Sequence, residues 1–265
     1  MGMAVPAALA ISAADPAGGL LATDLLGFRA HGVLGSGVVT AVTARGLRQP
    51  GPVQDVPVTL LRASLEAILA GEAPAAMKVG VLTSVPAVRT VARAVAARPE
   101  PRVLDPGFAP RSGVRLVRPA VVDAVLRDLL PGATLLVVNL GEASALAGFA
   151  LRNEADAKAA ARRIQALGPA AVLVTGGATE GPTLVDGLLD GRTWYRFECR
   201  RIAVPAGTRA RDLLSASVTA LLAAGETLPD AVARALPYVR SSLEAGWPAF
   251  PLPDPPARRP PDAPR

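Results

Sequence analysis

The stretch Ala8-Leu-Ala-Ile-Ser-Ala-Ala-Asp-Pro-Ala-Gly-Gly19 gives the first indication of the fold. Its apolar first half is typical of a buried β-strand, and the Asp-Pro-Ala-Gly-Gly segment that follows is typical of a turn. A helix is expected next, and His31-Gly32 marks its end, because glycine commonly follows the last turn of a helix. This order of strand, turn and helix predicts the first unit of an α/β domain.

The same alternation continues along the chain, and Asp-Gly pairs in the segment 183–195 predict a late antiparallel hairpin. The predicted strands are 8–12, 37–44, 77–82, 103–105, 134–138 and 171–174, and the predicted helices are 20–30, 60–69, 87–97, 120–130, 155–167, 212–224 and 229–245. Strands that alternate with helices predict a mostly parallel sheet with helices on both faces.

Length and composition predict one large domain over residues 1–247 and a separate tail over residues 248–265. The tail is rich in proline and arginine, and this composition supports neither a helix nor a sheet, so we expect it to be disordered. Mean hydropathy is +0.36, yet no apolar run approaches the roughly 18 residues that a membrane span needs. The first residues lack the basic region of a secretory signal, and we therefore expect a cytoplasmic protein.

Several classes of chemistry and of partner are disfavoured by the composition. One cysteine, Cys199, and one histidine, His31, exclude an internal disulfide and argue against a zinc enzyme. The net charge is +6, but the arginines are spread along the chain among acidic residues and aromatic residues make up only 3%. This pattern favours a solvated surface over a nucleic-acid partner, for which clustered basic residues and stacking aromatics are expected.

Seven short motifs follow one another in a characteristic order. They are Asp15-Pro-Ala-Gly-Gly19, Gly37-Val-Val-Thr-Ala-Val-Thr-Ala44, Met77-Lys-Val-Gly-Val-Leu82, Val103-Leu-Asp-Pro106, Asn139-Leu-Gly-Glu142, Val172-Leu-Val-Thr-Gly-Gly177 and the helix that contains Asp212. Together they resemble the ribokinase-like superfamily, and within it the hydroxymethylpyrimidine and phosphomethylpyrimidine kinases of thiamine biosynthesis. The resemblance covers residues 7–222. It implies a three-layer α/β fold, a small-molecule substrate, and ATP and Mg²⁺ as cofactors.

The stretch Val204-Pro-Ala-Gly-Thr-Arg-Ala-Arg-Asp212-Leu-Leu-Ser-Ala-Ser217 runs from a loop into an apolar helix, with a lone carboxylate at the junction. A carboxylate there can act as a base beside a phosphate group, because helix N-termini favour negative charge. The alternative is that Asp212 only caps the helix. The resemblance implies the first role, since ribokinase and pyridoxal kinase relatives use an Asp as base at this position.

The resemblance also implies a phosphate region. Asn139 and Glu142 match an Asn-x-x-Glu element that helps to organise magnesium and phosphate in relatives, with Glu142 as the candidate metal ligand. Thr175 and Gly176 match the segment that approaches the nucleotide phosphates. For the first pair the alternative is structural: Asn139 caps a helix that begins near Gly141, and Glu142 lies in its first turn.

Two arginines depart from the family pattern. Relatives carry glycines where this chain has Arg209 and Arg211, and those glycines form a turn whose N–H groups face the transferred phosphoryl group. Arginine in a left-handed conformation costs roughly 1 kcal/mol or more, which argues against the same turn here. The two guanidinium groups clamp phosphate directly, fill the site, or pair with Asp212.

The substrate pocket that the resemblance implies also departs from the pyrimidine kinases, for example where Arg45 replaces a Gln that reads the pyrimidine. Its residues are Ala13, Asp15, Gly19, Arg45, Val81 and Gly107. Two classes of function therefore stay open: an ATP-dependent kinase of a hydroxymethyl group on a pyrimidine or similar heterocycle, including a pyridoxal kinase-like enzyme, or a catalytically silent relative that binds a small ligand or a protein. Assembly is also open, with a homodimer as one alternative.

Overall fold

The computed structural model describes residues 5–16, 18–44, 51–71, 73–108, 117–176, 181–202 and 209–246. Within these residues nine strands form one sheet in the order β3-β2-β1-β4-β5-β6-β7-β8-β9. The parallel strands are β1 (Ala7–Ala14), β2 (Leu34–Thr43), β4 (Ala76–Val79), β5 (Arg102–Leu104), β6 (Leu135–Asn139) and β7 (Ala171–Thr175). Antiparallel strands close both edges: β3 (Val53–Asp55) on one side, and β8 (Thr183–Asp190) and β9 (Thr193–Arg200) on the other.

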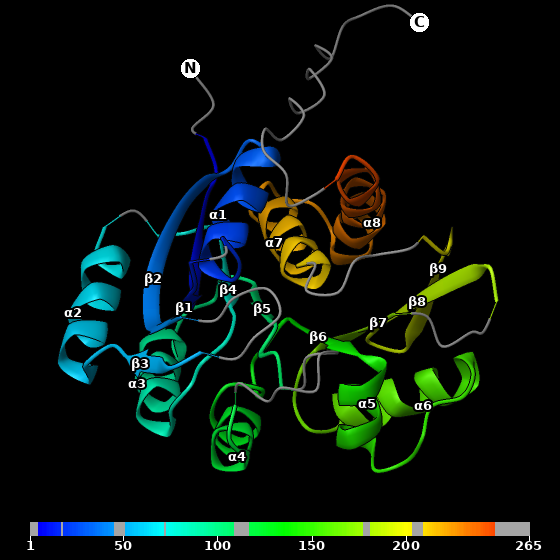
Figure 1. Ribbon diagram of the computed structural model, residues 1–265, viewed down its shortest axis with the longest axis horizontal. Coiled ribbons are helices and arrows are strands. Elements are labelled where there is room, and N and C mark those ends of the chain that lie inside the picture. Colours follow the sequence, from blue (N-terminus) through cyan, green and yellow to red (C-terminus); the bar gives the residue numbers. More distant parts are fainter. Residues whose placement is uncertain are drawn as a thin grey trace, which may run out of the picture.

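Helices cover both faces of the sheet (Figure 1). One face carries α1 (Leu21–Ala30), α7 (Ala210–Ala223) and α8 (Leu228–Glu244), and the other carries α2 (Val58–Leu69), α3 (Val85–Val95), α4 (Pro119–Asp128), α5 (Leu140–Ala147) and α6 (Glu154–Gln165). The side chains of β1 explain this arrangement: Leu9 and Ile11 join one apolar core, and Ala8 and Ala10 join the other. A strand that is buried on both faces needs a layer on each side, which confirms the three-layer fold.

The path of the chain explains which helices lie on which face. From β1 the chain runs to β2 on one side, and it later returns to β4 on the other side of β1. Because parallel crossovers are right-handed, connections that run in opposite directions place their helices on opposite faces. The reversal lies between β1 and β4, and ligand sites of open α/β sheets form at such a point, outside the carboxyl ends of the strands.

Helix α7 lies in the middle of its layer, between α1 and α8, and it also contacts the sheet (Figure 1). Every residue from Leu213 to Ala223 is buried, which explains why this helix is apolar all round rather than on one stripe. Gly27 of α1 allows the close approach of the two helices, because a Cβ at Gly27 would lie 2.7 Å from the Cβ of Ala216. The fold thus fixes the start of α7 directly beside the strand ends.

The predicted strands and helices are confirmed to within a few residues, and so is the late hairpin. Two elements were not among those predicted: α5, which entered only as an alternative, and β3, a three-residue edge strand that is too short to show a periodic pattern. The tail 248–265 and Arg45 lie outside the described residues. In the part of the chain that the structure describes, no helix has both the length and the apolar character that a membrane span requires.

Candidate functional site

Six charged side chains meet at the carboxyl edge of the parallel strands, and we call this group the ion-pair cluster. It consists of Asp15, Asp105, Glu142, Arg209, Arg211 and Asp212. Asp15 follows β1, Asp105 follows β5, and Glu142 lies in the first turn of α5, directly after β6. The remaining three residues lie at the start of α7. The sheet and the N-termini of α5 and α7 therefore bring four carboxylates and two guanidinium groups together.

Arg209 spans from α7 to the end of β1. Its Nη2 lies 2.6 Å from Oδ2 of the buried Asp15, and its Nη1 lies 3.7 Å from Oδ2 of Asp212. The guanidinium lies against Gly19, where an added Cβ would lie 2.4 Å from Nε of Arg209. The backbone of Arg209 has φ −90°, outside the left-handed region. The glycine turn of the relatives is therefore not reproduced at this residue, and the side chain pairs with carboxylates instead.

Arg211 bridges two carboxylates that come from neighbouring strands. Its Nε lies 2.8 Å from Oδ1 of Asp105, and its Nη1 donates to Oε2 of Glu142 at 2.5 Å. Burial by itself lowers the pKa of Arg211, but Asp105 and Glu142 outweigh it and raise that pKa above its ordinary value. Ser215 adds a hydrogen bond from its hydroxyl to the other oxygen of Asp105 at 2.7 Å. The guanidinium is thus a fixed positive charge between two buried carboxylates.

Asp212 lies within the first turn of α7, not at its cap. The prediction that this helix begins at Asp212 is wrong by two residues, because the helix begins at Ala210 and Arg209 is its N-cap. The side chain of Asp212 is 15% exposed, so it is partly open to solvent. A carboxylate in the first helical turn still benefits from the helix dipole.

Asn139 caps α5 and Glu142 lies in its first turn, as the structural alternative predicts, and together they form a capping box. Oδ1 of Asn139 accepts the N–H of Glu142 at 2.9 Å, and Oε2 of Glu142 accepts the N–H of Asn139 at 3.0 Å. The same Oε2 receives the guanidinium of Arg211. The side chain of Glu142 therefore takes part in both the N-cap of α5 and the ion-pair cluster. It is held by the N–H of Asn139 and by the guanidinium of Arg211.

Thr175 and Gly176 lie at the end of β7, one strand further along the same edge. The hydroxyl of Thr175 donates to the carbonyl oxygen of Val138 at 3.2 Å, and the N–H of Gly176 donates to Oδ1 of Asp186 at 2.8 Å. Gly176 has φ +98°, a conformation that favours glycine. The sequence did not single out Asp186, which lies on β8 of the hairpin.

The described residues of the predicted substrate pocket fall into two groups. Gly19 and Asp15 contact Arg209, and the N–H of Gly19 donates to Asp15 at 3.2 Å. Ala13 of β1, Val81 after β4 and Gly107 after β5 form the second group: the N–H of Ala13 donates to the carbonyl of Val81 at 3.1 Å, and a Cβ at Gly107 would lie 3.0 Å from Val81. That same Cβ would lie 3.5 Å from Nη2 of Arg211, so this group also borders the ion-pair cluster.

Sequence reasoning missed a buried ion pair beneath the cluster. Lys78 of β4 pairs with Asp24 of α1, and both side chains are almost completely buried. The ammonium group also donates to the main-chain carbonyl of Asp212 at 3.2 Å. Burial raises the pKa of Asp24 to about 7, although Lys78 acts in the opposite direction. The signal was a charged residue in an otherwise apolar strand, since such a residue needs a partner.

Asp105 was quoted as part of a motif but was not among the predicted site residues. It directly follows a strand and precedes a proline, and it is buried at 2% exposure. A buried carboxylate at a strand end is the signal that could have identified it.

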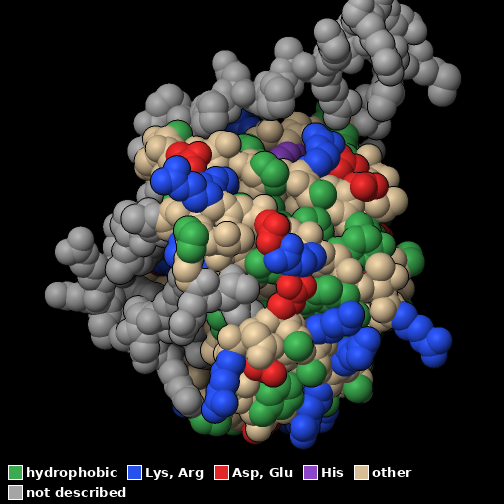
Figure 2. Space-filling model, turned by 90° about the vertical axis from the view of Figure 1, so that its right-hand side faces the viewer, with side chains coloured by type: hydrophobic (Ala, Val, Ile, Leu, Met, Phe, Trp, Pro, Cys, Tyr) green, Lys and Arg blue, Asp and Glu red, His purple; other side chains and the backbone are tan. Residues whose placement is uncertain are grey.

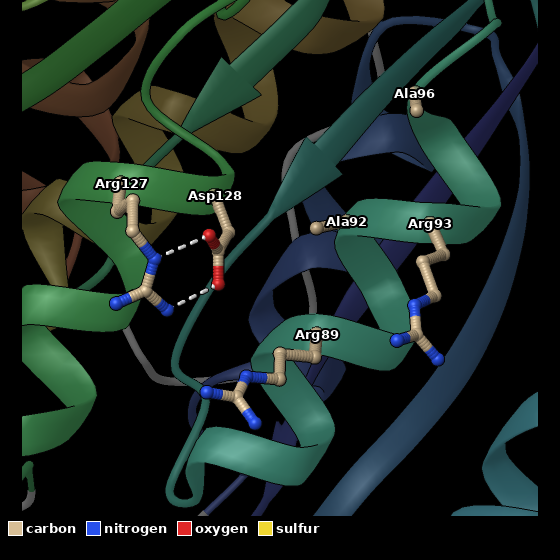
Figure 3. A pocket seen from close by; sticks show the side chains of 6 residues that line it. All are labelled: Arg89, Ala92, Arg93, Ala96, Arg127 and Asp128. Carbon is tan, nitrogen blue, oxygen red and sulfur yellow. Dashed lines mark hydrogen bonds and ion pairs between the residues drawn. The ribbon is translucent and has the colours of Figure 1, made fainter.

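A surface hollow of about 420 Å³ lies elsewhere, between α3 and α4 (Figure 3). Its charged lining residues are Arg89, Arg93, Arg127 and Asp128, and Arg127 is already paired with Asp128 through two hydrogen bonds of 2.7 Å. None of its lining residues belongs to the ion-pair cluster. On the face seen in Figure 2, basic side chains are spread out, with acidic side chains among them.

Comparison with known proteins points to one family. The model of the phosphomethylpyrimidine kinase family matches residues 15–250. The hydroxymethylpyrimidine/phosphomethylpyrimidine kinase of Synechococcus elongatus is 37% identical over 244 residues, which cover 91% of this chain and 92% of the relative. The crystal structure of phosphomethylpyrimidine kinase from Clostridium difficile superposes with a TM-score of 0.79 at 26% identity, covering 89% of this chain and 99% of that one.

A pyridoxal kinase has a similar structure. The enzyme from Staphylococcus aureus, solved in complex with AMP-PCP and pyridoxal, gives a TM-score of 0.81 at 28% identity and covers 92% of this chain and 90% of its own.

Proposed function

This chain belongs to the phosphomethylpyrimidine kinase family, and on that premise we propose that it is an ATP-dependent kinase of a hydroxymethyl group on a pyrimidine or a similar small heterocycle. The observation that carries the proposal is the position of Asp212, in the first turn of α7 and beside the carboxyl ends of β1 and β5. This is the edge at which open α/β sheets bind their ligands.

Asp212 is the proposed general base. Its carboxylate is partly exposed and lies 3.7 Å from the guanidinium of Arg209. In this role it takes the proton of the substrate hydroxyl while the phosphoryl group is transferred. Phosphoryl transfer depends mainly on positioning and on charge stabilisation, so the residues around the base decide whether the reaction proceeds.

The positively charged side chains proposed to bind phosphate are Arg209 and Arg211. Thr175, Gly176 and Asn139 are further proposed phosphate-binding residues along the same edge of the sheet. Both arginines already pair with carboxylates, so phosphate groups must compete with Asp15, Asp105 and Glu142 for them. We assign the substrate to the space bordered by Asp15, Gly19, Val81 and Gly107, with Ala13 and Arg45 as the other proposed pocket residues.

ATP is the proposed phosphoryl donor, and the S. aureus enzyme was solved with the ATP analogue AMP-PCP. Magnesium is expected for this family, and Glu142 with Asp105 would be its ligands. The arrangement does not fit a divalent cation, because the guanidinium of Arg211 pairs with both carboxylates. We therefore assign no step of the reaction to a metal ion.

One observation favours the second candidate function, a catalytically silent relative that binds a small ligand or a protein. The side chains of Arg209 and Arg211 pair with carboxylates at the start of α7, where the family resemblance implies glycines. If these ion pairs persist when nucleotide is added, the phosphate region is closed.

The test is a nucleotide titration by calorimetry, followed by phosphorylation assays with ATP and hydroxymethylpyrimidine, phosphomethylpyrimidine or pyridoxal. We expect Asp212→Asn to lower turnover by about a hundredfold or more and to leave nucleotide affinity largely unchanged, since general-base contributions are of that size. Asp123→Asn, an exposed position on α4, is the matched control. An unchanged rate in Asp212→Asn would remove this residue from the mechanism, and no nucleotide binding at all would favour the silent relative.

A further inference from the structure

Asp105 and Glu142 form a buried acidic pair that requires a positive charge. Each side chain is 1% exposed; Asp105 directly follows β5, and Glu142 lies in the first turn of α5, just after the adjacent strand β6. Two negative charges that share a buried site repel each other strongly unless a cation compensates them. In this chain the compensating charge is the guanidinium of Arg211, which contacts one oxygen of each carboxylate.

The surrounding contacts hold Arg211 at this position. It lies in the first turn of α7, a helix that is buried from Leu213 to Ala223. The hydroxyl of Ser215, one helical turn later, donates to the same Asp105, and Lys78 donates to the carbonyl of the neighbouring Asp212. A guanidinium stays protonated at every pH that a folded protein meets, so it supplies a permanent charge.

A divalent cation would need the oxygens that Arg211 already contacts. Hard cations such as Mg²⁺ bind carboxylate oxygens, and Oδ1 of Asp105 and Oε2 of Glu142 are the atoms paired with the guanidinium. An ion beside them would also lie a few ångströms from a positive charge, where repulsion is strong in a buried setting. Arg211 and a metal ion therefore exclude each other at this pair.

We propose that Arg211 is the resident cation of this site: its guanidinium takes the place of a divalent metal ion between Asp105 and Glu142. The chain accordingly does not take up a divalent cation there, and a bound nucleotide meets a guanidinium group instead. The nucleotide part of this inference rests on the proposed kinase function, whereas the part on cation binding does not.

The first test is the binding of Mn²⁺ alone to the full chain, followed by electron paramagnetic resonance. We expect saturable binding by Arg211→Ala, and no saturable binding by the wild type even at Mn²⁺ concentrations about tenfold above those that half-saturate the variant, because removal of the guanidinium frees the carboxylate pair. The double variant Arg211→Ala/Glu142→Gln should lose this gain. Arg127→Ala, which removes one arginine charge from α4, should bind Mn²⁺ no better than the wild type. Equal binding by the wild type and Arg211→Ala, including none by both, would overturn the proposal.

A second comparison keeps the proposal testable if Arg211→Ala does not fold. Glu142→Gln retains the capping box, because Gln is also accepted at that helix position. We expect this variant and the wild type to show the same lack of saturable Mn²⁺ binding. Saturable binding by the wild type that Glu142→Gln removes would overturn the proposal.

AMP-PCP titrations distinguish this inference from the kinase proposal. We expect the wild type to bind AMP-PCP with the same affinity in EDTA and in Mg²⁺, within about threefold, and Arg211→Ala to require Mg²⁺. A wild type that needs Mg²⁺ would overturn the inference. If the wild type binds no AMP-PCP under either condition, the kinase proposal and the nucleotide part of the inference fail, and the Mn²⁺ comparison still decides the cation part.

Discussion

The ammonium group of Lys78 links three distant parts of the chain. Lys78 is a residue of β4, and its ammonium group pairs with Asp24 of α1 and donates to the carbonyl of Asp212 at the start of α7. The ion pair lies under the ion-pair cluster, so its loss affects both the helix packing and the position of the proposed base. This single residue thus connects the stability of the core with the geometry of the site.

Replacement of Lys78 by Met should destabilise the protein by about 3 to 5 kcal/mol, because Asp24 is then buried without its counter-charge. Urea unfolding followed by circular dichroism measures the effect. The matched double variant Lys78→Met/Asp24→Leu should recover most of the loss, since an apolar pair of similar volume replaces the ions. A Lys78→Met variant that unfolds at the same urea concentration as the wild type would contradict a stabilising role for the pair.

At the scale of residues, Arg209 and Arg211 show which contacts could not be predicted from the sequence. The substitution of both glycines was visible in the sequence, and so was the choice between a phosphate clamp and a filled site. Of the pairings, only the one between Arg209 and Asp212 was anticipated. The pairings with Asp15, Asp105 and Glu142 were not, because those partners are 69 to 194 residues away in the chain. Only the sheet order makes them neighbours.

At the scale of elements, prediction succeeded where the pattern is long and periodic. The helices α3, α6 and α8 and the hairpin β8–β9 have clear signals and were found within about two residues of their ends, except for the end of β9. The start of α7 was misplaced, because Arg209, Ala210 and Arg211 carry no cap signal, and its N-cap makes no side-chain hydrogen bond. The position of β4 beside β1 has no local signal, since it follows from the long-range path of the chain.

The contact between α1 and α8 should make stability depend on pH. His31 is the C-cap of α1, and its ring meets Tyr238 of α8 edge to face at 4.7 Å between centroids. Burial lowers the pKa of His31 from 6.5 to about 4, with a smaller contribution from Arg234. Between these two values the unfolded chain binds a proton that the folded chain does not, so this residue makes stability fall as the pH drops from 6.5 to 4.

Asp24 acts in the opposite direction, because its pKa is raised to about 7 in the folded protein. The contribution of His31 is therefore isolated by comparison of the wild type with His31→Phe, which keeps an aromatic ring against Tyr238. The melting temperature of the wild type should fall more between pH 7 and pH 4.5 than that of His31→Phe. Parallel pH profiles of the two proteins would show that His31 does not titrate as described.

At the scale of the whole molecule, one sheet joins both apolar cores. Every described strand belongs to that sheet, and α7 contacts β1, β4 and β5 as well as two helices. Such a molecule should resist cleavage between its halves. We predict that limited proteolysis removes the Pro-rich residues after position 247 and leaves one stable core, as read by mass spectrometry. Two fragments of comparable size would contradict a single domain.

The double substitution Arg209→Gly/Arg211→Gly removes both positive charges of the ion-pair cluster. In the structure both guanidinium groups are held by carboxylates, so their removal frees the backbone N–H groups at the start of α7 and allows a left-handed turn there. If the arginines fill the phosphate region, the variant should bind ATP more tightly than the wild type. If they release the carboxylates and clamp phosphate, it should bind more weakly, by about 1 to 3 kcal/mol per lost charged hydrogen bond.

Isothermal titration with ATP separates these outcomes by the sign of the change in ATP affinity. Titrations in EDTA and in Mg²⁺ show whether ATP binding to the variant requires a metal ion. The ion pairs argue for the first sign, because a nucleotide must break one short contact to release Arg209 and two to release Arg211. Tight ATP binding by the wild type that the paired change abolishes would contradict this and would establish both arginines as phosphate ligands.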